Sequence, residues 1–314
     1  MAKADIQNAA FTDDEKAREA FEAVRWPNGP FCPHCGNLDQ EKIAKGRGTA
    51  HRPGLYYCAA CNGQFTVTIG TVMERSKIPL SKWLFAMHLM AASKKGVSAL
   101  QLQRMLGVTY KTAWFLCHRI REAMTPQTHG PIGGQGRTVE SDETVFGGKS
   151  KNRAYAKKEP RKLTVLTLVD RDGESHSFHV ANVKAETLRA AIDKTVDRAS
   201  HLMTDELLSY GKIGQEFAGH TTVNHSADEY VRLGGFAHIN NAECRFSLMK
   251  RAVFGTHHSI SEAHLARYLA EWDFKFNTRK LRDGERAELI AKGIEGKRLT
   301  YRPANGNSDE AAVR

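Results

Sequence analysis

Four of the six cysteines form two pairs, Cys32 with Cys35 and Cys58 with Cys61, and each pair brackets two residues. Such a turn points both sulfurs toward one point, so two turns supply four thiolates in the tetrahedral arrangement that Zn²⁺ prefers. The 22 residues between the pairs can form a hairpin that brings the two turns together. Because four thiolates fill the coordination sphere, the spacing predicts a structural zinc ion with no open position for a water.

Disulfides and a redox-active pair are the two alternatives for these cysteines. The N-terminus, MAKADIQNAAFTDDEK, alternates charges where a secretory signal needs an apolar core, and no apolar run approaches the roughly 18 residues of a membrane span. We therefore expect a cytoplasmic protein with no membrane partner, in which thiols stay reduced. Two matched pairs also argue against a redox role.

Three acidic residues, Asp142, Asp205 and Glu243, have residue types and positions that suit a second kind of metal site. Burying three unpaired carboxylates costs several kcal/mol each, so they are poor core residues. Together they could hold two Mg²⁺ or Mn²⁺ ions about 4 Å apart, which activate a hydroxyl and steady the leaving oxygen in phosphodiester cleavage. The alternative is that each is one of the 35 acidic residues and lies on a solvated surface.

The elements that must position these carboxylates form a mixed sheet flanked by helices. Asp142 lies in an expected strand over 137–145, Asp205 follows a short strand at 201–203, and Glu243 lies in a helix over 240–253. If the first and fourth strands are neighbours, their carboxylates meet on one side of the sheet and the helix supplies the third. The remaining expected elements of this mixed sheet are strands at 162–170, 175–180 and 221–224 and a helix at 184–199.

The expected helix over 240–253 carries a polar stripe. Asn240, Glu243, Ser247 and Lys250 follow one another at i, i+3, i+7 and i+10, which is one face of a helix. This face would direct an amide, a carboxylate, a hydroxyl and an ammonium to one site. We expect Glu243 to complete the metal site, Asn240 to hold a ligand or phosphate, and Lys250 to neutralise a phosphate, unless the lysine is simply solvated.

Upstream, the sequence predicts three helices with a turn typical of DNA-binding proteins. A first helix opens near Pro79, a second is capped by Ser98 and ended by Gly107, and a third is capped by Thr109. Two helices joined by a short turn that contains glycine form a helix-turn-helix, or else a plain helical hairpin. In the first reading the third helix presents four residues outward to DNA, namely Tyr110, Lys111, Arg119 and Arg121.

The net charge of +11 is concentrated in this region. Residues 31–130 carry 13 basic and 4 acidic side chains, whereas residues 131–314 carry 29 basic and 25 acidic ones. A concentrated basic block indicates a polyanionic partner such as double-stranded DNA, although a basic solvated surface would look the same. We expect an α+β multidomain protein with a zinc ribbon at 21–75, a helix-turn-helix module at 76–125, a linker at 126–136, a catalytic domain at 137–281, and a charged, partly disordered tail at 282–314.

Ordered motifs along the chain resemble the DDE transposases of bacterial insertion sequences, in the zinc-ribbon subgroup whose catalytic domain is called ISXO2-like. The resemblance covers about residues 21–280, and its ordered motifs are more specific than any single one. The matching catalytic residues are Asp142-Glu143-Thr144 with Gly147-Gly148-Lys149, then Thr204-Asp205-Glu206 with Tyr210, then Val223–Ser226 with Glu229–Val231, and last His238, Asn240, Glu243, Ser247, Leu248, Lys250-Arg251, Gly255 and His257–Ser259. Cys244, Arg245 and Phe246 depart from the usual Gly, Phe and Trp of that family, and we expect Arg245 to alter the packing or the DNA contact beside the site.

The resemblance implies an RNase H-like catalytic domain and a transposase that acts on DNA. It implies binding of terminal inverted repeats, Mg²⁺-dependent cleavage at the ends and strand transfer, with Asp142, Asp205 and Glu243 holding the ions. Two ends must be joined, so it also implies a homodimer or larger assembly, in a bacterial cytoplasm and on the nucleoid when bound to DNA. The alternatives are a DNA-binding transcriptional regulator without catalysis and a metal-dependent nuclease that does not join ends.

Overall fold

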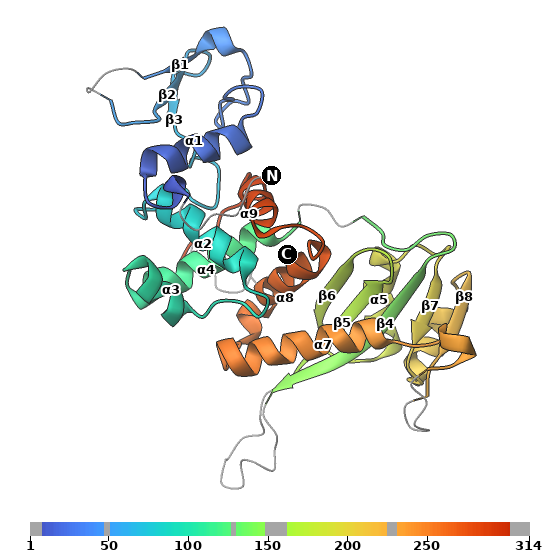
Figure 1. Cartoon of the computed structure of the whole chain (residues 1–314). Helices are drawn as coiled ribbons and strands as arrows, with labels where there is room; N and C mark the ends of the chain where they lie inside the picture. The colour runs from blue at the N-terminus through green and yellow to red at the C-terminus, as the bar shows by residue number, and fades with distance from the viewer. Residues whose placement is uncertain (1–7, 47–50, 127–129, 148–161, 225–230, 302–314) are drawn as a thin grey trace. The chain divides into compact units, whose positions relative to one another are not determined.

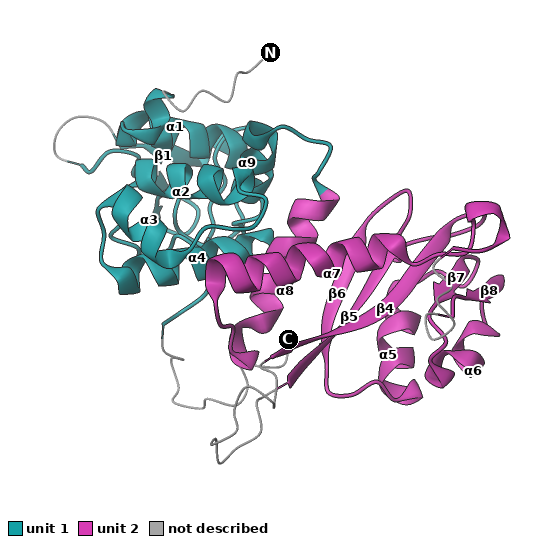
Figure 2. Ribbon diagram, turned by 60° about the horizontal axis from the view of Figure 1, so that its bottom comes forward, with its two compact units in different colours: residues 1–126, 278–314 teal, residues 127–277 magenta. Residues whose placement is uncertain are grey.

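The computed structural model describes residues 8–46, 51–126, 130–147, 162–224 and 231–301. The chain folds into two compact units (Figure 2). Unit 1 combines residues up to Pro126 with residues from Thr278 onward, and unit 2 comprises Gln127–Asn277. Within the described residues, no helix is long and apolar enough to cross a membrane.

Unit 1 begins with a helix and a small antiparallel sheet, which together form the zinc-ribbon part of the chain (Figure 1). The elements are α1 (Asp14–Arg25), β1 (Ile43–Lys45), β2 (Tyr56–Cys58) and β3 (Gly63–Phe65), and the strand order is β1-β2-β3. Trp26 packs edge-on against Tyr56 and Phe65, with ring centroids 5.2 and 5.9 Å apart. The Tyr56 hydroxyl donates to Glu22 at 3.0 Å, so α1 is fastened to the sheet and belongs to this part.

Three helices follow, α2 (Leu80–Ala92), α3 (Ala99–Leu106) and α4 (Tyr110–Met124). Ser98 and Thr109 accept hydrogen bonds from the backbone N–H groups of Gln101 and Thr112, so both expected N-caps are present. Gly107 ends α3 with φ 61°, a left-handed conformation that favours glycine. The predicted pair of helices with a short turn is therefore present.

The C-terminal part of the described chain is folded, contrary to the expectation of a charged tail from 282. Helix α9 (Asp283–Lys292) buries Ala287, Ile290 and Ala291 and packs against α2 and α4. Beyond it, the Ile294 carbonyl accepts from the Val72 N–H at 3.2 Å. Residues 302–314, which include the stretch expected to be disordered, lie outside the described residues.

Unit 2 is built on a mixed five-stranded sheet in the order β6-β5-β4-β7-β8. Its strands are β4 (Thr138–Gly147), β5 (Lys162–Asp170), β6 (Ser175–Val180), β7 (His201–Thr204) and β8 (Gly219–Thr222). The pairs β4–β5 and β5–β6 are antiparallel, whereas β4–β7 and β7–β8 are parallel. The first and fourth strands are therefore neighbours, as the β4–β7 pair, which is the condition under which their carboxylates were expected to meet.

Helices cover both faces of this sheet (Figure 1). They are α5 (Ala185–Thr195), the short α6 (Gly211–Gly214), α7 (Asn240–Ala252), which continues as a π-helical turn over Val253–His257, and α8 (Glu262–Asn277). Val139 packs with the α5 side, and Phe146 packs with α7 and α8. Because successive strand residues face opposite sides, odd-numbered residues of β4 face α5 and even-numbered ones face α7.

The predicted linker over 126–136 is only partly a linker. Residues 127–129 lie outside the described residues, but Ile132 is buried in the core on the α5 side and pairs with Val196. Gly133 has φ 89°, and a Cβ at that position would lie 2.1 Å from the Ser200 hydroxyl, so only glycine fits there. The chain thus enters unit 2 before β4 begins.

Candidate metal sites and the helix that joins one of them

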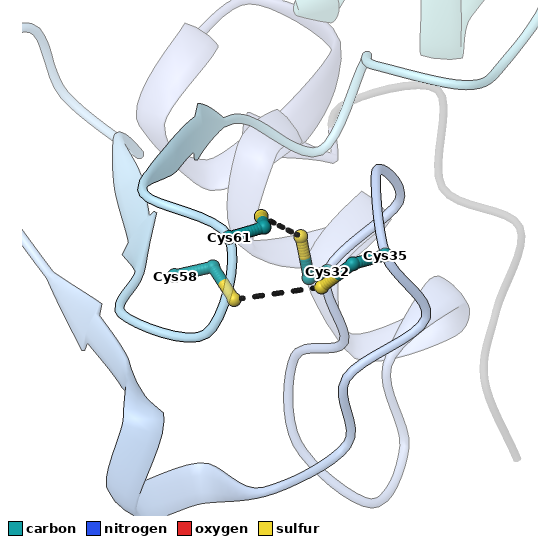
Figure 3. Close-up of side chains that lie close together, drawn as sticks. All are labelled: Cys32, Cys35, Cys58 and Cys61. Atoms are coloured by element: carbon teal, nitrogen blue, oxygen red, sulfur yellow. Dashed lines mark hydrogen bonds between the residues drawn. The ribbon is translucent and has the colours of Figure 1, made fainter.

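The four cysteines of the two CxxC pairs converge on one point, as the spacing predicts (Figure 3). The Sγ atoms of Cys32 and Cys61 are 3.6 Å apart, and those of Cys35 and Cys58 are 3.8 Å apart. A tetrahedral zinc with Zn–S bonds of about 2.3 Å needs sulfurs about 3.8 Å apart, so the four thiols fit this ion. The sulfurs are much too far apart for a disulfide, whose S–S bond is about 2.05 Å.

Two of the three predicted carboxylates also come together, but with an unpredicted one. Asp142, Glu143 and Asp205 each place one oxygen within 4.8 Å of the others. The β4–β7 ladder ends at the pair of Glu140 and Met203, so the carboxylates surround the space just beyond the end of β7. Two oxygens bound to one Mg²⁺ are at most about 4.2 Å apart, so small side-chain rotations suffice for binding.

The electrostatics of this cluster favour a cation. Burial raises the pKa of Asp142 to about 8; a hydrogen bond from the Glu143 N–H lowers it in part, and the charges of Glu143, Asp205 and Glu243 raise it further. Burial also raises the pKa of Glu143 to about 7, although a hydrogen bond from Tyr210 opposes the rise. Carboxyl groups that keep their protons near neutral pH are stabilised in their ionised form by a nearby divalent cation.

Glu243 is near this cluster but not within the group of three. Its charge reaches Asp142, where it helps to raise the pKa, and its side chain is exposed on α7. Asp142 is an even-numbered residue of β4 and therefore faces α7, as the prediction requires. The role of Glu243 as a third ligand remains a prediction.

A buried carboxylate that the sequence reading missed anchors α7 beside the cluster. Glu140 is fully buried and accepts hydrogen bonds from the backbone N–H groups of Asn241 and Ala242 at 2.9 and 3.1 Å. Arg171 donates to the same carboxylate at 2.8 Å. Anions are favoured at a helix N-terminus, so Glu140 fixes the start of α7 on the same face of β4 as Asp142. Glu243 follows directly after this anchor.

Tyr210 holds a carboxylate on the other face of β4. Its hydroxyl accepts from Ser141 at 3.0 Å and donates to Glu143, and its side chain is fully buried. Glu143 is thereby held although it faces the α5 side of the strand. The sequence signal for Glu143 was its place directly after Asp142, and the signal for Tyr210 was its place five residues after Asp205.

The polar residues of α7 share one face, as their spacing predicts, and that face is exposed. Asn240, Glu243, Ser247 and Lys250 are all exposed, while the opposite stripe buries Ala242, Phe246 and Met249 among other residues. The roles expected for Asn240 and Lys250 remain predictions. The segment 225–230 and residues Gly148 and Lys149, which carry parts of the motifs, lie outside the described residues.

Arg245, one of the departures from the family pattern, points into the interior of unit 2. It is 2% exposed, and its Nε and Nη1 donate to Ser175 Oγ and the Trp272 carbonyl at 3.2 and 3.0 Å. Its Nη2 donates to Asp273 at 2.5 Å, which ties α7 to α8. A contact of Arg245 with DNA is therefore excluded, and its role is in packing.

Two of the four residues expected to face DNA do so less than predicted. Tyr110 and Lys111 are exposed on the first turn of α4. Arg121 is 2% exposed, and Arg119 is half-buried and donates to the carbonyls of Leu299 and Glu74. The prediction was wrong for Arg121, whose side chain is buried, and inexact for Arg119, whose guanidinium donates to the C-terminal segment at Leu299.

Comparisons with known proteins agree with these two sites. Residues 12–64 match the transposase zinc-ribbon domain family, and residues 133–277 match the ISXO2-like transposase domain family. An uncharacterized protein in the transposable element ISH50 of Halobacterium salinarum is 26% identical over 280 residues, which is 84% of this chain and 91% of that protein. That relative is archaeal, so the expected bacterial source remains a prediction. With both domain matches in order and together covering more than half of the sequence, the chain belongs to the ISXO2-like DDE transposases that carry an N-terminal zinc ribbon.

Proposed function

We propose that this protein is the transposase of an insertion sequence and that it binds, cuts and joins the DNA ends of its element. The observation that carries the proposal is the meeting of Asp142 and Asp205 beyond the end of β7, inside the stretch that matches the transposase domain. The order of strands and the helices on both faces support an RNase H-like assignment of unit 2. The basic region with the ribbon and helices α3 and α4 supports binding of the terminal repeats.

In the proposed reaction, Asp142, Asp205 and Glu243 hold two Mg²⁺ or Mn²⁺ ions. When bound, these ions supply the charge neutralisation and the activated hydroxyl for phosphodiester cleavage and transfer. Tyr210 holds the Glu143 carboxylate beside the ligands, and Glu140 keeps the start of α7 in place. Asn240 and Lys250, on the same exposed stripe as Glu243, orient the scissile phosphate.

A homodimer or larger assembly follows from the reaction itself, since two ends must be joined to nearby target positions. The zinc ion holds the ribbon together, because a domain with so small a sheet has too little core to fold well by itself. A regulator without catalysis is less well supported, because it would not need Asp142, Asp205, Glu243, Asn240 and Lys250 together.

The test is an assay with a supercoiled plasmid that carries both ends of the element, incubated with the purified full chain and Mg²⁺. The proposal predicts joined products that require Mg²⁺ and both ends. Nicking without joined products would instead indicate a nuclease, and DNA binding without nicking would indicate a regulator. A genomic observation complements the assay, since inverted repeats should flank the coding sequence.

A further inference from the structure

A basic cavity lies beside the first turns of α4 in unit 1. Its volume is about 410 Å³, and its lining comprises Arg75, Ser76, Lys77, Ile78, Trp83, Lys111, Thr112, Phe115, Leu116, Arg119 and Tyr301. Four of these residues are cationic and none is acidic. The charge of the lining therefore calls for an anionic ligand.

Part of the cavity lining comes from the C-terminal segment, which was expected from the sequence to be a charged tail. This segment contacts the stretch before α2, where the Gly296 N–H donates to the Gly70 carbonyl at 2.9 Å. It also contacts the end of α1, where Arg25 forms an ion pair with Glu295. It then runs along α4, where the Leu299 carbonyl accepts from Arg119 at 3.2 Å. It reaches the first turns of that helix at Tyr301.

Aromatic rings hold two of the cations at the cavity. The Lys111 ammonium lies 4.4 Å from the ring centroid of Tyr301, and the Arg119 guanidinium lies 4.7 Å from that of Phe115. The two rings contact each other edge-to-face at 5.7 Å. Such contacts fix the side chains without neutralising their charge, so the cations are positioned before a ligand arrives.

The cations of this region also have few anions to compensate them. Burial lowers the pKa of Arg119 and the nearby charge of Arg298 lowers it further, whereas the charge of Glu74 raises it. Arg75 and Lys77 also line the cavity, from the stretch before α2, and both are exposed. Glu74 lies near Arg75 at 3.8 Å, but it does not line the cavity.

We propose that this cavity binds a backbone phosphate of double-stranded DNA. The first turns of α4 would lie in a groove of the DNA, and the phosphate would belong to the DNA strand that borders this groove. In DNA-binding pairs of helices, the first residues of the second helix contact base edges and neighbouring basic groups contact the flanking phosphates. Lys77 and Lys111, which both line the cavity, contact that phosphate, and Tyr301 positions Lys111. The identity of the polyanion rests on the proposed function; the location of the contact rests on the cavity.

The test measures binding of the full chain to two duplexes, one from the end of the element and one of random sequence, by fluorescence anisotropy at NaCl concentrations from about 50 to 200 mM. Lys77→Gln should weaken binding to both duplexes by about eightfold at about 0.1 M salt. It should also reduce the slope of log affinity against log salt concentration by about 0.9, which is the effect of one lost phosphate contact. Tyr301→Ala should act in the same direction, and Tyr301→Phe, which keeps the ring, should bind like the wild type.

The matched control is Lys292→Gln, which removes the same charge from unit 1 at a lysine that pairs with Glu288 and does not line the cavity. If the dependence of affinity on salt is the same for Lys77→Gln as for this control, the inference is overturned. The proposed function would still stand in that case if the wild type joins DNA ends. A loss confined to the duplex from the element's end would indicate base contacts and also overturn it. If the wild type bound neither duplex, both proposals would fail.

Discussion

Replacement of Arg245 by methionine is expected to destabilise unit 2 strongly. The guanidinium and Asp273 form a buried ion pair, and Asp273 also accepts from the Ser177 N–H and hydroxyl at 2.7 and 2.8 Å. Methionine fills much of the volume of the arginine stem but leaves the carboxylate without its cation. Breaking one side of a buried pair costs about 3–5 kcal/mol, because an uncompensated charge stays inside.

The pH dependence of this loss distinguishes it from a simple packing defect. Burial raises the pKa of Asp273, and the charge of Arg245 now opposes that rise. Without Arg245 the folded-state pKa rises further above the ordinary value of about 3.9 that the unfolded chain has. The folded variant then binds more protons than the unfolded one, so its stability falls as pH rises, by up to about 1.4 kcal/mol per pH unit. The deficit against the wild type should thus grow as pH rises from the folded-state pKa of Asp273 in the wild type to its higher folded-state pKa in the variant.

Hydrogen exchange of the β5 amides in the full chain would measure the unfolding free energy of unit 2 separately from that of unit 1. Arg251→Met is the matched control, because Arg251 is exposed on the same helix and its Nε donates to the Ser247 carbonyl at 3.2 Å; its effect should be within about 0.5 kcal/mol. The double variant Arg245→Met with Asp273→Asn should recover stability and lose the pH trend. Equal stability of Arg245→Met and Arg251→Met, or a deficit that is constant with pH, would refute this reasoning.

Three further predictions concern the metal sites. Cys35→Ser should lower the zinc content of the protein and remove the exchange protection of β2, whereas full protection of a zinc-free ribbon would contradict a structural zinc. Mg²⁺ affinity should rise between about pH 6 and pH 8.5, because the pKa of Asp142 is raised to about 8 and that of the neighbouring Glu143 to about 7, so that binding of the cation releases protons from both; calorimetry in two buffers would detect that release, and a pH-independent affinity would argue against Asp142 as a ligand with Glu143 beside it. Glu140→Gln should raise the Mg²⁺ concentration needed for joining by about tenfold through loss of the α7 anchor, and an unchanged requirement would show that the anchor does not position the site.

Local rules predicted the parts of the molecule that local chemistry determines. The spacing of the cysteines predicted a four-sulfur cluster, and strand patterns predicted that Asp142 and Asp205 would meet if the first and fourth strands were neighbours, as they are. Helical spacing likewise predicted that Glu243 shares one helix face with Asn240 and Lys250. Each of these predictions depends on the geometry of one turn, one helix or one strand pair.

Contacts between distant segments could not be predicted in this way. Strand alternation places Glu143 on the face opposite Asp142, and only the hydrogen bond of Tyr210 and the end of the β4–β7 ladder explain their meeting. Arg119 looked free to reach DNA because nothing in α4 itself reveals the later segment to which its guanidinium donates. The buried carboxylate of Glu140 gave no sign, since its partners are backbone groups of a helix a hundred residues away in sequence.

The central claim is that Asp142 belongs to the metal site that joins DNA ends, and strand transfer by Asp142→Asn tests it most directly. The carboxylate loss should lower the rate of joining by about a thousandfold, since a catalytic metal supplies several kcal/mol of charge stabilisation and 1.36 kcal/mol corresponds to a factor of ten. Asp172→Asn, at an exposed aspartate in the β5–β6 turn, should join ends like the wild type. Both variants should bind the end duplex with wild-type affinity. Loss of joining with retained end binding is the predicted result for Asp142→Asn, and joining at the wild-type rate would contradict the account.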